Sequence, residues 1–133
     1  MYAHQMIRTH PHVKGNVNKA LIESIEECYS CAQACTSCAD ACLGEPMVQQ
    51  LTQCIRLNLD CADICAATGS VSTRRSGSNQ ESIRSMLRAC ADICVLCGEE
   101  CRRHAAAHAH CRICADACMA CAQSCERALE SME

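Results

Sequence analysis

Cysteine recurs along this chain at steps of three and four residues, with one step of seven, in four separate blocks. A heptad a/d stripe on an α-helix has this spacing, whereas one face of a β-strand would need steps of two. Ala, the best helix former, fills many of the intervening positions. The pattern therefore predicts four helices that each direct one cysteine-lined face inward. The stripe consists of Cys28, Cys31, Cys35, Cys38, Cys42, Cys54, Cys61, Cys65, Cys90, Cys94, Cys97, Cys101, Cys111, Cys114, Cys118, Cys121 and Cys125.

Turn-forming residues separate these four helices. Gly44-Glu45-Pro46 ends the first, a polar run from Gly69 to Asn79 follows the second, and the third break lies within His104 to His110. We expect an N-terminal tail at 1–15 and one domain at 16–133, with helices at roughly 17–43, 46–68, 80–105 and 109–131. Four inward stripes and short links predict an all-α fold, an antiparallel four-helix bundle with a Cys-lined core.

Antiparallel folding also predicts which residues share a level of this bundle. One end collects apolar residues and is called the aliphatic end: Leu21, Ile25, Ile83, Leu87 and Leu129. The other is called the histidine mouth: Met47, His104, His108 and His110. Reversal of the chain at Gly44-Glu45 predicts that Cys35 lies near Cys54 and Cys28 near Cys61. Reversal at the third break predicts that Cys101 lies near Cys111 and Cys90 near Cys125.

The composition explains why thiols would occupy the core. Leu, Ile, Val and Phe number only 21 of 133 residues, below the share expected for a conventional core, whereas the chain has 17 Cys and 20 Ala. Free Cys is a small side chain that is readily buried. The net charge of -3 gives no indication of a nucleic-acid partner. The sequence has no carboxylate pair, Ser–His–Asp set or phosphate-binding loop, so an enzyme is not expected.

The N-terminal residues suggest the compartment. Met1 to Gly15 has no apolar run of signal-peptide length, and no segment has the roughly 18 consecutive apolar residues of a membrane span. We therefore expect a cytoplasmic protein with no membrane partner, in which thiols stay reduced. An odd number of cysteines, 17, also cannot pair completely within one chain. A disulfide framework is thus the weaker interpretation.

Thiolates three or four residues apart on a helix can bridge one soft metal ion, which indicates Cu(I), Zn or an iron–sulfur cluster. Charge distinguishes these options. Zinc at four thiolates each would take about four ions and leave roughly nine of the 17 thiolate charges uncompensated. Burying that charge is prohibitive, whereas one monovalent ion per thiolate leaves the core neutral. The sequence therefore favours multiple Cu(I) ions per chain, with Zn fitting only part of the core.

Other interpretations explain the pattern less well. Iron–sulfur clusters usually use compact Cys runs on loops, often followed by Pro, and no Cys here precedes Pro. Five CxxC motifs suggest thioredoxin-like chemistry, but that motif needs a strand–helix context. A copper chaperone needs one or two exposed sites, whereas 17 ligands in a closed interior favour storage. Asn58, inward between Cys54 and Cys61, either fixes the register or contacts metal weakly.

A short motif occurs once in each predicted helix, as Cys-Ala-Asp followed by Ala or Ile and a second Cys. With these motifs, the four Cys-rich helices and the lack of a signal peptide, the chain resembles the cytosolic branch of the bacterial four-helix-bundle copper storage proteins. The resemblance implies many Cu(I) ions held by the inward cysteines, and a homotetramer. His104, His108 and His110 are either further ligands or a solvated turn. The four copies are Cys38–Cys42, Cys61–Cys65, Cys90–Cys94 and Cys114–Cys118.

Overall fold

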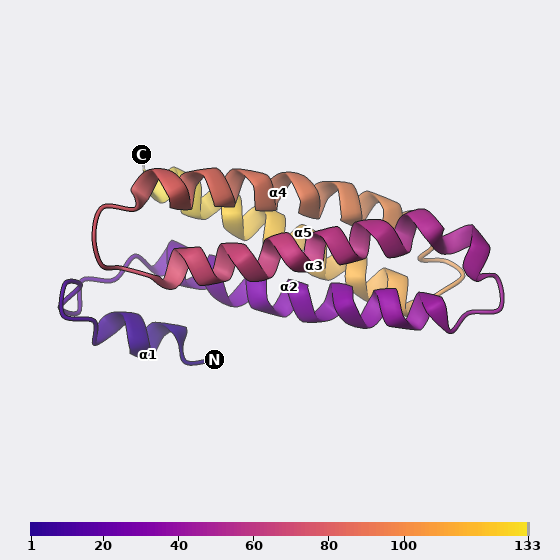
Figure 1. The fold of residues 1–133 in the computed structure, drawn as a ribbon, viewed down its shortest axis with the longest axis horizontal. Helices are drawn as coiled ribbons and strands as arrows, with labels where there is room; N and C mark the ends of the chain where they lie inside the picture. The colour runs from indigo at the N-terminus through magenta and orange to yellow at the C-terminus, as the bar shows by residue number, and fades with distance from the viewer. Residues whose placement is uncertain (133) are drawn as a thin grey trace.

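Four long helices lie side by side and alternate in direction in a computed structural model, which describes residues 1–132 (Figure 1). They are α2 (Lys19–Leu43), α3 (Thr52–Thr73), α4 (Gln80–Arg103) and α5 (Ala109–Ser131). Helix α2 packs against α3 and α5, and α4 packs against the same two helices. The antiparallel four-helix bundle predicted from the cysteine spacing is confirmed, and no strand occurs within residues 1–132.

The repeated motif shows why these segments are helical and how each one faces its neighbours. Its cysteines are buried, its aspartates are exposed, and the Ala after the first cysteine is buried as well. Small residues beside the cysteine stripe let neighbouring helix backbones approach closely. The side chain of Asn18 caps the start of α2 by accepting a hydrogen bond from the backbone N–H of Leu21 at 3.1 Å. The buried alanines are Ala39, Ala62, Ala91 and Ala115.

The second long helix lies further along the chain than the sequence predicts. The residues after Pro46 form a turn and a short 3-10 helix, η1 (Val48–Leu51), so α3 begins at Thr52 where a helix was expected from 46. At its other end α3 runs through Gly69 to Thr73, where the sequence predicts a loop. A Cβ on Gly69 would lie 2.9 Å from the ring of Tyr29. Gly69 therefore allows close packing of α2 on α3 and does not end the helix.

Residues 1–15, expected as a tail, contain a short helix, α1 (Ala3–Arg8), which lies beside α2 at the end where the chain terminates (Figure 1). Ile7 is only 5% exposed and lines a small cavity with Leu21 and Ile22. The half-buried His10 and the exposed His12 follow this helix. This segment therefore packs as a strap over the aliphatic end.

The aliphatic end is closed by apolar packing. Leu21, Ile25, Ile83 and Leu87 are each at most 3% exposed, and Leu129 packs partly buried against them. The α2–α3 and α4–α5 connections both lie at the opposite end of the bundle (Figure 1). No helix among the described residues has the length and apolar character needed to cross a membrane.

Candidate metal centre

The bundle interior is a column of thiols. All seventeen cysteines are free and at most 2% exposed. Their Sγ atoms lie 3.6–4.0 Å apart in many pairs, both within a helix and across helices. Disulfide bonding requires about 2.05 Å between sulfur atoms, so these contacts are between reduced thiols.

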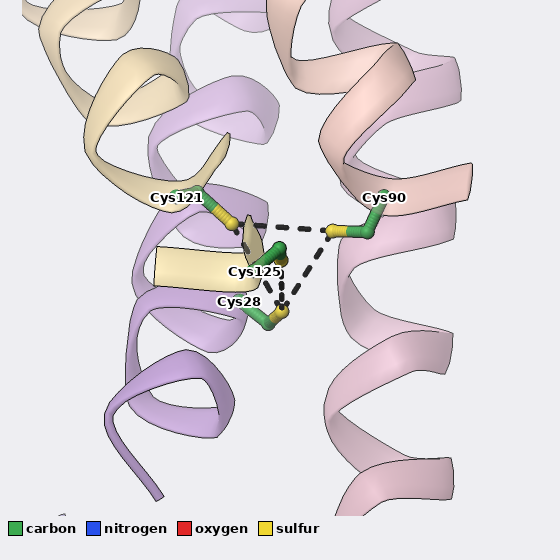
Figure 2. A group of neighbouring side chains, drawn as sticks. All are labelled: Cys28, Cys90, Cys121 and Cys125. Carbon is green, nitrogen blue, oxygen red and sulfur yellow. Dashed lines mark hydrogen bonds between the residues drawn. The ribbon is translucent and has the colours of Figure 1, made fainter. Parts of the chain in front are cut away.

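Four of these thiols form a compact group near the aliphatic end (Figure 2). Cys28 comes from α2, Cys90 from α4, and Cys121 and Cys125 from α5. The Sγ atom of Cys28 lies 3.7 Å from that of Cys90 and 3.9 Å from those of Cys121 and Cys125. Four sulfur atoms thus point into one small volume, where a soft metal ion could bind two or more of them.

The groups continue along the bundle by sharing members. Each consists of four cysteines whose Sγ atoms all lie within 4.8 Å of one another. Cys121, Cys31, Cys35 and Cys118 each belong to two groups, so the sites near the aliphatic end and in the middle merge into one array. A metal bound at one group is therefore within reach of thiols of the next. The middle groups are Cys31, Cys65, Cys94 and Cys121; Cys31, Cys35, Cys61 and Cys118; and Cys35, Cys97, Cys114 and Cys118.

The register of α3 against α2 differs from the prediction. Cys54 groups with Cys38 and Cys42 instead of Cys35, and Cys61 groups with Cys31 and Cys35 instead of Cys28. The prediction placed the reversal at Gly44-Glu45, but the turn and η1 extend it to Leu51 and move its centre toward Met47. The predicted register of α4 against α5 was closer to the structure, because Cys90 and Cys125 share a group.

A further group of four thiols, called the mouth group, lies at the histidine mouth, where an imidazole adjoins it. Its thiols are Cys38, Cys42, Cys54 and Cys111, from α2, α3 and α5. The Nδ1 atom of His110, in the first turn of α5, lies 3.5 Å from the Sγ of Cys38 and 3.6 Å from that of Cys111. One ring nitrogen is thus placed among the outermost thiols. This arrangement offers a mixed nitrogen and sulfur environment for a metal ion.

The other two mouth histidines lie in the α4–α5 connection, and each contacts a carboxylate. His104 Nε2 lies 3.0 Å from Glu100, and His108 Nδ1 lies 2.6 Å from Glu45. The rings of His108 and His110 stack with their centroids 5.4 Å apart. The three histidines are therefore arranged by specific contacts. Met47 lies at the same end and is 39% exposed.

Sequence reasoning missed both carboxylates. Glu100 precedes His104 by four residues on α4, a spacing that places two side chains on one helix face and could have identified it. Glu45 and His108 come from different connections that are far apart in the sequence, so no local pattern links them.

Asn58 occupies the inward position predicted for it and is fully buried. Its Oδ1 accepts hydrogen bonds from the thiols of Cys114 at 3.0 Å and Cys97 at 3.2 Å, and its amide lies 3.5 Å from the sulfur of Cys54. Asn58 is therefore a polar centre that joins thiols of α3, α4 and α5. Of the two roles considered, these contacts favour fixing the register of the metal-free bundle.

Burial opposes ionisation of Cys42 and Cys111, two of the thiols at the mouth. Loss of hydration raises the pKa of Cys42 to about 11 and that of Cys111 to about 12. Deeper in the column, hydrogen bonding with Cys114 is the main cause that raises the pKa of Cys35. These thiols are neutral at physiological pH without metal, and a metal must displace their protons to bind.

The chemistry of this column follows from its ligands. Soft thiolates select soft ions, and the shared groups allow one sulfur to bridge two metals. Among the described residues no Lys or Arg is buried, so a bound cation must itself balance each thiolate. A four-helix bundle with such an interior defines a class of protein, a container for many soft, singly charged metal ions.

Comparison with known proteins places the chain within that class. It belongs to the copper storage protein family, whose sequence profile matches residues 17–130. The match includes α2, α3, α4 and all but the last residue of α5.

Individual relatives agree with this assignment. The chain is similar to the copper storage protein Ccsp of Streptomyces lividans loaded with 10 copper equivalents, with 50% identity, a TM-score of 0.93, and 97% of this chain and 98% of that chain covered. It is also similar to Cu(I)-bound BsCsp3 of Bacillus subtilis, with 38% identity, a TM-score of 0.65, and 77% and 92% covered. The cysteine-rich protein YhjQ of Bacillus subtilis is 41% identical over 88 residues, 66% of this chain and 76% of its own.

Proposed function

We propose that this protein stores copper as Cu(I), bound by the thiolates of its seventeen buried cysteines. The observation that carries the proposal is the array of four-thiol groups, which shared cysteines join from Cys28 to Cys114. Cys101 links this array to the group at the mouth, because its Sγ lies 3.8 Å from that of Cys54 and its thiol shares the Oδ1 of Asn58 with Cys97 and Cys114. Monovalent copper suits this array because one ion per thiolate leaves the interior neutral, whereas Zn²⁺ at four thiolates would leave buried negative charge. Family membership and the copper-loaded relatives support the same assignment.

The three histidines act as ligands at the histidine mouth. His110 already contacts two thiols, and neutral imidazole is a ligand that adds no negative charge. The closed aliphatic end and the strap over it support uptake from the opposite end. Copper thus binds first near Cys38, Cys42, Cys54 and Cys111 and then reaches the deeper groups.

The role is storage and not catalysis or delivery. A chaperone exchanges one or two ions through exposed ligands, whereas every cysteine here is buried. The acidic residues of the repeated motifs face solvent, away from the thiols. Both features support a container from which copper leaves slowly.

The reduced thiols support a cytosolic location, which is also stated for a similar copper storage protein of Streptomyces lividans. We further propose a homotetramer. Leu59, Leu96 and Ile113 are each between 47% and 56% exposed on different helices, and association would cover such side chains. Native mass spectrometry of the metal-free and loaded protein tests this assembly, and a monomer in both states would contradict it.

A Cu(I) titration of the reduced protein tests the storage function. With a calibrated chelator as competitor, uptake is expected to end near one Cu(I) per Cys, which for this chain is about 17. Saturation at about four ions would indicate a tetrahedral metal such as zinc and contradict the proposal.

Two sets of variants separate the mouth from the column. Replacing His104, His108 and His110 with Ala is expected to slow uptake about tenfold or more, while capacity falls only by the sites they complete. Replacing Cys35 and Cys118 with Ser is expected to lower capacity and leave the initial rate nearly unchanged. Stopped-flow uptake from a Cu(I) donor measures both. A triple histidine variant that loads at the native rate would place copper uptake elsewhere.

A further inference from the structure

Glu100 is a buried carboxylate with two partners. It lies in the last turn of α4, its side chain is 8% exposed, and its two oxygens contact Arg103 and His104 separately. Burying a carboxylate is unfavourable unless it is paired and hydrogen-bonded. The contacts with Arg103 and His104 are therefore what allows this carboxylate to be buried at the mouth.

Glu45 contacts a different mouth histidine from the other connection of the same end. It lies between α2 and η1, whereas its partner His108 is the residue immediately before α5. The side chain of His108 is 8% exposed and that of Glu45 is 27% exposed, so the ring is enclosed and the carboxylate is partly solvated. The pair joins the α2–α3 connection to the α4–α5 connection.

These contacts determine which ring nitrogen of each histidine carries the proton. A carboxylate only accepts hydrogen bonds, so the nitrogen that faces it must be an N–H donor. In the neutral ring, His104 therefore has its proton on Nε2 and its lone pair on Nδ1. His108 has the opposite tautomer, with the proton on Nδ1 and the lone pair on Nε2. Metal binding uses the lone pair, and a carboxylate on the other nitrogen also makes the ligand more basic.

The two histidines lie next to the outermost thiols. The ring of His108 stacks on that of His110, whose Nδ1 contacts the thiols of Cys38 and Cys111. The backbone N–H of His104 donates to the carbonyl oxygen of Cys101 at 3.0 Å, and the Sγ of Cys101 lies 3.8 Å from that of Cys54. Each carboxylate–histidine pair thus adjoins members of the mouth group.

We propose that Glu45 and Glu100 are positioning residues for copper uptake, which hold His108 and His104 in the tautomers that present Nε2 and Nδ1 to incoming Cu(I). This inference rests on the proposed storage function, because it concerns how the same array is filled. Cu(I) exchanges from these nitrogens to the thiols of the mouth group, and the carboxylates themselves remain outside the coordination sphere.

The test uses the variants Glu45→Gln and Glu100→Gln in the full chain, with Glu99→Gln as the matched control. Glu99 is exposed and adjacent to Glu100, so its substitution makes the same change in charge without touching a histidine. A glutamine amide can donate or accept, so it no longer determines the tautomer. Circular dichroism of each variant confirms that the bundle is intact.

Two measurements decide the outcome. Long-range ¹H–¹⁵N correlation spectra of the metal-free protein at a pH where imidazole is neutral are expected to show His104 as the Nε2–H form and His108 as the Nδ1–H form. Each Gln variant is expected to mix the tautomers of its own partner histidine only. Stopped-flow loading at one copper equivalent is expected to slow about tenfold or more in each Gln variant, with full capacity retained.

The remaining results would overturn the inference. Unchanged tautomers in the Gln variants, altered tautomers with native loading rates, or an equal slowing in Glu99→Gln would each exclude a positioning role. Failure of the storage function itself gives a different result, because the wild-type protein would then fail to take up copper in the capacity titration.

Discussion

Asn58 is the polar residue most enclosed by thiols, and its amide gives the metal-free bundle a directional contact that cysteines alone do not provide. We expect Asn58→Ala to lower the free energy of unfolding of the metal-free protein by about 1–3 kcal/mol, because the thiols of Cys97 and Cys114 lose their acceptor. Urea unfolding of the reduced protein measures this. The control is Gln53→Ala, an exposed position on the same helix. Equal stability of the two variants would show that the buried amide contributes nothing.

The mouth thiols predict how stability depends on pH. Folding raises the pKa of Cys42 to about 11 and that of Cys111 to about 12, from an ordinary value of 9.0. A raised pKa stabilises the fold below pH 9.0, and this contribution is lost as pH rises toward 11–12, because the unfolded chain then releases protons that the folded chain retains.

Thermal unfolding of the reduced, metal-free protein is therefore expected to shift to lower temperature above about pH 9, the ordinary thiol value. The copper-loaded protein serves as the comparison. Its thiols have already lost their protons, so its unfolding temperature should change little over the same range. A metal-free protein that is equally stable at pH 8 and pH 11 would contradict the effect of burial.

At the scale of the helices, the alanines beside the cysteine stripe determine how closely the backbones approach. Ala115 on α5 is 2% exposed, whereas Ala120 on the same helix faces solvent. We expect Ala115→Leu to reduce the free energy of unfolding by about 1–3 kcal/mol, because the interface has no room for the larger side chain. Ala120→Leu should change it by less than about 0.5 kcal/mol. Chemical denaturation compares them, and similar effects would mean that the helices can separate at little cost.

At the scale of the whole molecule, the bundle is expected to form before copper binds. Neutral thiols pack as small apolar groups, so circular dichroism of the reduced, metal-free chain should show mainly helix. Loading should then release about one proton per Cu(I), because each thiol ionises as it becomes a ligand. A pH-indicator titration measures the protons. A random-coil spectrum that becomes helical only with copper would contradict a preformed container.

Several properties of this protein could be predicted from the spacing and number of its cysteines alone. Steps of three and four between cysteines define one helix face, and this periodicity identified four helices and their inward stripes. The number of thiols and the negative charge they would carry favoured a soft, singly charged ion over zinc. These properties depend on the positions of residues within one helix or on the composition, so the amino-acid sequence alone is sufficient to determine them.

Tertiary structure decided how the helices are set against one another. The η1 turn moved Cys54 beside Cys38 and Cys42, and Gly69 became a packing position where a break was expected, because Tyr29 of another helix lies against it. The contact of Glu45 with His108 joins two connections that are distant in sequence. Such features depend on the length of a turn and on the rotation of each helix about its axis. Those quantities are set by packing between segments, and no periodicity within a segment determines them.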